Sequence, residues 1–208
     1  MASADPLQQR VLHRILRVAL RLMFRGATVL PAPERIQRRW IEWISVVARS
    51  APGTVMQPGQ WDRVRGAAFA CAAAPAPDTA VLYLHGGGYT LGSHRTHAAL
   101  ASHLARAGST TVVVPDYRLA PEHPYPAALE DALKVYGALL DTYDASRLAI
   151  AGDSAGGGLA LSLVVALRAA GLPLPAALVL ISPWTDLTLD GGTHQTLRSR
   201  DPMLSARW

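Results

Sequence analysis

Short apolar runs alternate with amphipathic stretches from residue 81 onward, and this alternation constrains the fold more than any other feature of the sequence. Buried strands are predicted at residues 81–84, 111–114, 148–151 and 177–181, and helices at 96–107, 127–140 and 156–170. Strands and helices that alternate in this way form a parallel sheet with helices on both faces, joined by right-handed crossovers. We therefore predict an α/β fold with a mostly parallel, doubly wound sheet.

Two amphipathic helices are predicted before the first strand. Residues 7–25 place apolar side chains at helical spacing with arginines on another face, and residues 34–49 repeat the pattern. The pattern changes after Pro58 and Gly59, and residues 63–71 alternate loosely as a strand. With 208 residues, half of them apolar, the chain can bury one substantial core. The predicted organisation is an N-terminal helical segment at 1–50 and an α/β domain at 51–208.

The positive charge of the chain is concentrated at its N-terminus. Residues 1–49 contain nine arginines against three carboxylates, whereas the whole chain carries a net charge of +5. A solvated helix face explains these arginines, while docking on a membrane surface or on a partner stays open. The basic residues lack the aromatic interleaving of a single-strand-binding surface, so no nucleic-acid partner is expected.

Cysteine usage and hydropathy indicate the compartment. Cys71 is the only cysteine, so an internal disulfide cannot form, and no C-x-x-C or zinc-binding spacing occurs. The N-terminal apolar segment is interrupted by Arg14, Arg17 and Arg21, unlike a signal peptide or a membrane span. We expect a cytoplasmic protein without a bound metal.

Glycine-rich and polar motifs follow three of the predicted strands, at the edge where an α/β sheet binds its ligands. The motifs read HGGGY at 85–89, DYRLAPE at 116–122 and GDSAGG at 152–157. The third motif contains G-x-S-x-G between a strand and a helix, which is the setting of a nucleophile elbow centred on Ser154. Gly152 and Gly156 suit the sharp turn because neighbouring β-carbons would have no space there.

Other interpretations of these motifs remain open at this point. Ser154 could be an ordinary turn serine that caps the following helix. We interpret the carboxylate of Asp153 as satisfying the free N–H groups at the helix start, with a part in catalysis as the alternative. The three glycines after His85 either form a flexible turn or let bare N–H groups face an incoming oxygen.

The order HGGG, DYRLAPE and GDSAGG resembles that of the hormone-sensitive-lipase-like (bacterial family IV) esterases of the α/β-hydrolase superfamily, over residues 80–208. The resemblance implies an α/β-hydrolase fold and hydrolysis of short- to medium-chain carboxylic esters through a serine acyl-enzyme. It implies Ser154 as the nucleophile. It also implies an oxyanion hole formed by the N–H groups of Gly87, Gly88 and Ala155.

The remaining motif residues receive supporting roles from the same resemblance. His85 shapes its loop rather than acting as the base, because the family's catalytic histidine follows the serine in the sequence. Arg118 and Glu122 brace the loop after their strand, and the first two helices resemble the family's N-terminal cap. No cofactor or metal is implied. The residues that support the two catalytic motifs are His85, Gly86, Gly152, Asp153 and Gly156.

The chain departs from the family pattern after residue 181. The acid and the histidine of a triad are expected after two further strands, but the sequence there offers only Asp186, Asp190, Asp201 and His194. A local triad of Asp186 and His194 is not expected, because no strand precedes that histidine. We expect a C-terminally truncated chain that lacks the last strands of the sheet, the triad acid and the triad histidine.

Two consequences and two alternatives follow from this expectation. Without a base to activate Ser154, the 208-residue chain itself should be inactive toward the small-molecule ester that is its expected partner. An unpaired apolar strand at 177–181 should make the chain self-associate. The main alternative is a non-catalytic α/β-hydrolase-like ligand-binding protein, which would be expected to retain the whole sheet. A membrane-anchored interaction module would leave Ser154 and the glycines unexplained.

Overall fold

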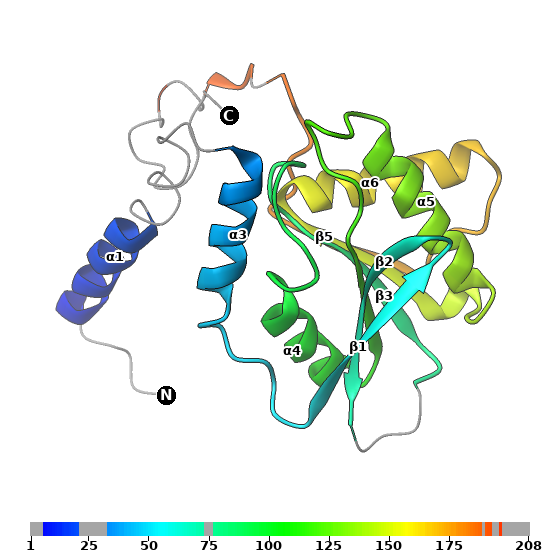
Figure 1. The fold of residues 1–208 in the computed structure, drawn as a ribbon, viewed down its shortest axis with the longest axis horizontal. Helices are drawn as coiled ribbons and strands as arrows, with labels where there is room; N and C mark the ends of the chain where they lie inside the picture. Colours follow the sequence, from blue (N-terminus) through cyan, green and yellow to red (C-terminus); the bar gives the residue numbers. More distant parts are fainter. Residues whose placement is uncertain (1–5, 21–32, 73–76, 189, 193–195, 197–208) are drawn as a thin grey trace. The chain divides into compact units, whose positions relative to one another are not determined.

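The computed structural model describes residues 6–20, 33–72, 77–188, 190–192 and 196 (Figure 1). The chain divides into two compact units. One unit is Ile41–Thr185, and the other combines Met1–Trp40 with Asp186–Trp208. The first unit holds the sheet and all three sequence motifs.

A six-stranded sheet forms the centre of the Ile41–Thr185 unit, with the strand order β1-β2-β4-β3-β5-β6. Strands β3 to β6 run parallel, whereas β1 pairs antiparallel with β2, and β2 pairs antiparallel with β4. The prediction of a mostly parallel sheet in an α/β fold is therefore confirmed. The strands are β1 (Thr54–Trp61), β2 (Val64–Cys71), β3 (Ala80–Leu84), β4 (Thr111–Pro115), β5 (Leu148–Asp153) and β6 (Ala177–Ile181).

Helices cover both faces of this sheet (Figure 1). On one face, α4 (Ala98–Gly108) packs through Ala101 and Ala105 against a cluster that includes Tyr83 and Val112. On the other face, α5 (Ala127–Leu140) and α6 (Ser154–Ala169) enclose the larger core cluster. A short 3-10 turn, η2 (Ala145–Arg147), leads into β5. Because consecutive strand residues point to opposite faces, β2, β3, β4 and β5 contribute to both clusters.

The structure adds one strand that the sequence did not predict. No strand was predicted before residue 63, but β1 continues through Pro58 and Gly59 and pairs with β2 along its whole length. A proline is tolerated there because β1 is an edge strand with a partner on one side only. Strand β1 is therefore an addition to the predicted sheet.

The N-terminal helices agree with the predicted pattern within the described residues. Helix α1 (Pro6–Leu20) is amphipathic, and its apolar residues Val11, Leu12 and Ile15 are about half exposed. Helix α3 (Glu34–Ser45) ends four residues before the predicted position. No helix among the described residues is long and apolar enough to cross a membrane. The domain boundary near residue 50 stays a prediction.

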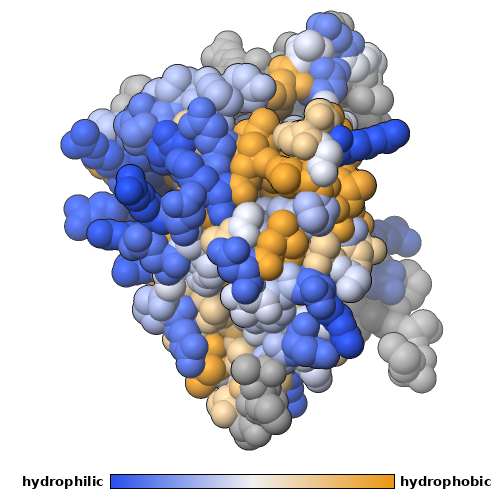
Figure 2. Space-filling view, turned by 90° about the vertical axis from the view of Figure 1, so that its right-hand side faces the viewer, coloured by the Kyte–Doolittle hydropathy of each residue, from blue (hydrophilic) through white to orange (hydrophobic). Residues whose placement is uncertain are grey.

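Strand β6 forms one edge of the sheet, and apolar side chains are exposed around it. Val179 is 51% exposed and Ile181 is 41% exposed, on the side of the strand that α6 does not cover. Val165 on α6 is 60% exposed. Figure 2 shows hydrophobic surface gathered next to a hydrophilic area on the side where α5 and the end of α6 lie in Figure 1.

Candidate active site

The turn from β5 into α6 presents Ser154 in a strained backbone conformation. Its φ of 52° lies in the left-handed region, which a residue other than glycine rarely adopts. A β-carbon at Gly156 would collide with the carbonyl oxygens of Leu84 and His85, and one at Gly152 would collide with Gly156 itself. Only glycines allow β3 and the start of α6 to approach so closely, so the G-x-S-x-G spacing forms the sharp turn that was predicted.

The loop after β3 runs beside this turn. Gly87 and Gly88 have φ values of 126° and 62°, and the Gly87 carbonyl accepts hydrogen bonds from the N–H groups of Thr90 and Leu91. Within the described part of the chain, the N–H groups of Gly87, Gly88 and Ala155 have no hydrogen-bond partner. Free N–H groups at a glycine loop and at a helix N-terminus can bind a negatively charged oxygen.

Asp153 connects the loop to the turn. Its Oδ1 atom accepts hydrogen bonds from the Tyr83 hydroxyl and the Gly86 N–H, each at 2.9 Å, and lies 3.3 Å from His97 Nε2. Burial alone would raise the pKa of Asp153. The hydrogen bond from His97, together with the bonds from Tyr83 and Gly86, outweighs that effect and lowers the pKa below the usual value of an aspartate.

The interpretation of Asp153 as a cap of α6 was wrong. Its side chain makes no capping hydrogen bond to the helix. Its backbone is still extended, so its side chain lies on the same face of β5 as Ala151, which belongs to the cluster under α4. The carboxylate therefore points toward His97 at the start of α4 rather than along α6.

His85 lies completely buried below the loop. Its Nδ1 atom is 2.9 Å from the Gly86 carbonyl oxygen, and its ring stacks on Tyr117 at 4.2 Å between centroids. Tyr117 also donates its hydroxyl hydrogen to the His85 carbonyl at 2.6 Å. Burial, and to a smaller extent the neighbouring His97, lower the pKa of His85 to about 4. The imidazole is therefore neutral at pH 7, with Nδ1–H as the donor to Gly86.

The loop after β4 is held by ion pairs on the other side of the sheet. The Arg118 guanidinium donates from Nε to both carboxylate oxygens of Asp131, and its Nη2 atom is 2.8 Å from Glu130 Oε2. These partners come from α5, and the sequence analysis did not name them. Asp116 is held by His94, whose Nδ1 atom lies 2.7 Å from the carboxylate.

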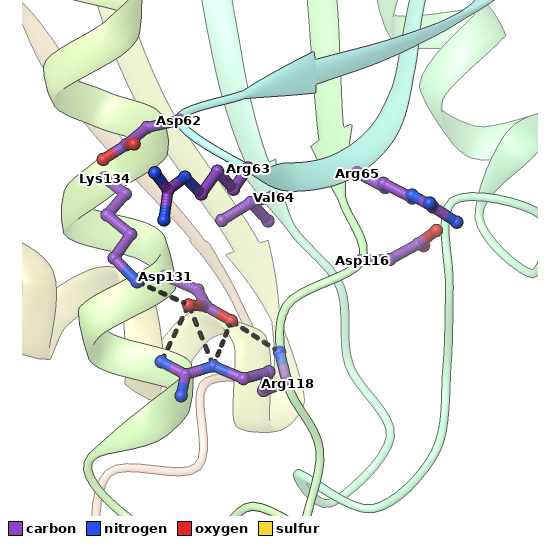
Figure 3. Close-up of a pocket in the computed structure, with 8 residues that line it drawn as sticks. All are labelled: Asp62, Arg63, Val64, Arg65, Asp116, Arg118, Asp131 and Lys134. Carbon is purple, nitrogen blue, oxygen red and sulfur yellow. Dashed lines mark hydrogen bonds and ion pairs between the residues drawn. The ribbon is translucent and has the colours of Figure 1, made fainter.

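Arg118, Asp116 and Asp131 also line a pocket of about 490 Å³, drawn in Figure 3. Arg63 and Val64 reach it from the turn between β1 and β2. Neither Ser154 nor the HGGG loop lines this pocket, so it is separate from the candidate active site. Arg118 and Asp131 are paired to each other across its lower side, which indicates a bracing role for both residues.

Asp186 and His194, for which a local triad was not expected, both belong to the Asp186–Trp208 part of the other unit. Asp186 accepts hydrogen bonds from the backbone N–H and the hydroxyl of Thr188, and His194 lies outside the described residues. Among the described residues, the Ser154 hydroxyl has no hydrogen-bond partner. In the part of the chain that the structure describes, no group of three or more His, Cys, Asp or Glu side chains could hold a metal ion. Within the described structure, the arrangement thus places the Ser154 hydroxyl beside free N–H groups, with no base in contact with that hydroxyl.

Comparison with known proteins identifies the family. A family model described as the alpha/beta hydrolase fold matches residues 81–208, which is more than half of the chain. The chain belongs to the α/β-hydrolase fold family. The predicted fold and the resemblance to hormone-sensitive-lipase-like esterases are confirmed.

Individual relatives of this α/β hydrolase agree with that assignment. It is 50% identical to an acetyl-hydrolase of Streptomyces hygroscopicus over 125 residues, which cover 60% of this chain and 42% of that protein. It is 43% identical to the putative acetyl-hydrolase LipR of Mycobacterium tuberculosis, over 89% of this chain and 61% of LipR. A solved esterase of the bacterial hormone-sensitive lipase family superimposes with a TM-score of 0.84 at 39% identity, over 92% of this chain and 65% of that one. The chain thus spans less than two thirds of the length of these relatives.

Sequence analysis missed Tyr83 and His97, which contact the Asp153 carboxylate. The alternation of β3 places Tyr83 on the α4 face, and His97 precedes the first residue of α4. A histidine at the start of the helix after the HGGG loop was the available signal. Its contact with Asp153 joins residues 56 positions apart, which a local pattern does not show.

Proposed function

We propose that residues 1–208 carry the nucleophile and the oxyanion hole of a carboxylic ester hydrolase that acts on short- to medium-chain acyl esters. The observation that supports this most is the strained Ser154 at φ 52°, beside a glycine loop in which the N–H groups of Gly87 and Gly88 are free within the described structure. A serine that only capped a helix would not require that conformation. Relatives named acetyl-hydrolase and ethyl acetate hydrolase support small acyl groups as substrates.

The proposed reaction begins with attack of Ser154 Oγ on the ester carbonyl. The N–H groups of Gly87, Gly88 and Ala155 then stabilise the negative charge on the carbonyl oxygen. Collapse of this intermediate expels the alcohol and leaves an acyl-enzyme, which water hydrolyses. The base that accepts the serine proton, and the carboxylate that orients this base, come in this proposal from outside the described residues.

Further expectations belong to the same proposal. Residues 1–50 form a cap segment and residues 51–208 a partial catalytic domain, which acts in the cytoplasm on a small-molecule ester. The chain self-associates through the exposed edge at β6, where Val179 and Ile181 are exposed. Contact of α1 with a membrane surface and binding of nucleic acid are not part of the proposal. Neither a cofactor nor a metal takes part in the proposed reaction.

A ligand-binding protein is the second candidate, because no base contacts the Ser154 hydroxyl in the described structure. The two functions differ in one measurable respect. A binding protein would hold an ester without cleaving it, and Ser154→Ala would leave its affinity unchanged. A hydrolase would lose its turnover in that variant.

The decisive experiment completes the chain. We would join residues 1–208 to the C-terminal part of LipR that lies beyond the matched region, and measure hydrolysis of 4-nitrophenyl acetate. Turnover is expected in the completed chain, but not in residues 1–208 alone. Ser154→Ala should abolish it, whereas Ser162→Ala, a control on the exposed side of α6, should not. Turnover that survives Ser154→Ala would reject the proposal.

A further inference from the structure

We propose that His97 and Asp153 are positioning residues. They hold the loop after β3, residues 86–92 and here called the oxyanion loop, against the turn from β5 into α6 that carries Ser154. The inference rests on the proposed function, because it assigns a role within that reaction. Neither residue needs to touch the substrate. Asp153 acts through the Gly86 N–H, and His97 acts through Asp153.

The geometry places Asp153 at the point where three elements meet. Its backbone directly precedes Ser154, so its position is fixed by the turn between β5 and α6. Its Oδ1 atom receives the Gly86 N–H from the oxyanion loop and the Tyr83 hydroxyl from β3, and it faces His97 Nε2. A β-carbon at Gly86 would collide with the other oxygen, Oδ2. The loop backbone therefore rests directly on this carboxylate.

The loop needs such an anchor because its own residues are flexible in the unfolded chain. Gly86, Gly87 and Gly88 are consecutive, and glycine loses more conformational freedom on folding than any other residue. Oxyanion donors work only when they are already oriented before the negative charge develops. The far end of the loop is held by the Gly87 carbonyl, which accepts from Thr90 and Leu91. The near end is held by Asp153.

His97 is itself fixed on both sides of its ring. Nε2 faces the Asp153 carboxylate at 3.3 Å, and Nδ1 lies 2.8 Å from the hydroxyl oxygen of Thr96. That hydroxyl in turn lies 2.8 Å from the Ser93 carbonyl oxygen, to which it donates. The His97 side chain is only 17% exposed. The start of α4 thus holds the imidazole in place, and the imidazole orients the carboxylate.

Amide hydrogen exchange on the 208-residue chain tests the positioning directly, because it does not require turnover. His97→Ala removes the hydrogen bond to the charged Asp153 carboxylate. Amide exchange in the segment 86–92 should therefore become about tenfold faster or more. Asp153→Asn should do the same. His97→Gln can still donate a hydrogen bond and should restore most of the protection. His103→Ala, an exposed histidine on α4, is the matched control and should change nothing.

A merely structural role would give a different result. If His97→Ala speeds exchange in α5 as much as in the segment 86–92, the variant has lost global stability, and the proposal is overturned. The proposal also fails if His97→Gln exchanges as fast as His97→Ala.

A second readout uses the completed chain. His97→Ala should lower kcat for 4-nitrophenyl acetate at least about tenfold, with little change in KM, because the oxyanion donors act mainly in the transition state. An equal change in KM would reject the proposal. If the completed chain with His97 intact shows no turnover, the proposed function fails, while the exchange experiment still decides whether His97 and Asp153 hold the loop.

Discussion

Buried His85 should make the stability of the fold depend on pH between about 6.5 and 4. The histidine is completely buried and neutral, and burial lowers its pKa from 6.5 to about 4. In the unfolded chain the same side chain takes up a proton near pH 6.5. Between these two values the unfolded state binds one more proton than the folded state, so the free energy of unfolding must fall as the pH falls.

The size of the effect follows from the pKa difference. One pKa unit corresponds to about 1.4 kcal/mol, so the shift of His85 from 6.5 to about 4 corresponds to a loss of about 3 kcal/mol across this range. The carboxylates of Asp116, Asp131 and Asp153 have pKa values below the ordinary 3.8 because of their hydrogen-bond and ion-pair partners. Their stabilisation is present above that value and is lost mainly at lower pH. His85 is therefore expected to dominate the slope above pH 4.

Urea unfolding followed by tryptophan fluorescence, at pH values from 7.5 down to 4, measures this slope. His85→Asn keeps a side-chain donor for the Gly86 carbonyl but cannot take up a proton in this range, so it should flatten the curve. His103→Asn replaces an exposed histidine and should leave the slope unchanged. A His85→Asn variant with the same slope as the unmodified chain would refute the reasoning.

Three further predictions concern the elbow, the oxyanion loop and the sheet edge. Gly156→Ala should destabilise the fold by about 1–3 kcal/mol in thermal melting, because its β-carbon meets the carbonyls behind the turn. Gly137 lies in α5, and a β-carbon there would have no neighbour within 4 Å. Gly137→Ala should therefore stabilise the fold by up to about 1 kcal/mol, and a Gly137→Ala variant less stable than Gly156→Ala would contradict the packing argument. In the completed chain, Gly88→Val should reduce kcat about 100-fold with a small effect on KM, and an equal effect on both would indicate a structural loop. Val179→Lys should reduce self-association in light scattering, whereas Gln57→Lys on the opposite edge strand should not, and equal behaviour of the two variants would exclude β6 as the contact.

Hydrophobic periodicity predicted the elements whose apolar pattern is continuous along the sequence. The helix at 127–140 and the strand at 177–181 have the predicted bounds, because their apolar patterns are continuous and their ends are marked by turn residues. Strand β1 was missed because edge strands tolerate proline and glycine, which otherwise indicate turns. The order of the strands and helices along the chain was enough to predict the fold class.

The candidate site could be predicted only where its residues are neighbours in the sequence. The strained Ser154 and its glycines form one local motif, so the spacing of that motif was enough. The direction of the Asp153 side chain depends on which face of β5 it occupies, and local sequence favoured a helix cap instead. His97 joins the site only because α4 packs beside β3, which is a tertiary contact.

Trapping the acyl-enzyme tests the central claim most directly. The completed chain would be mixed with excess 4-nitrophenyl acetate and stopped with acid within the first turnover, and its peptides would be analysed by mass spectrometry. We predict a burst of nitrophenolate close to one equivalent per chain, with the acetyl group on the peptide that contains Ser154. Acetyl on another residue, or the same burst from Ser154→Ala, would contradict the assignment of Ser154 as the nucleophile.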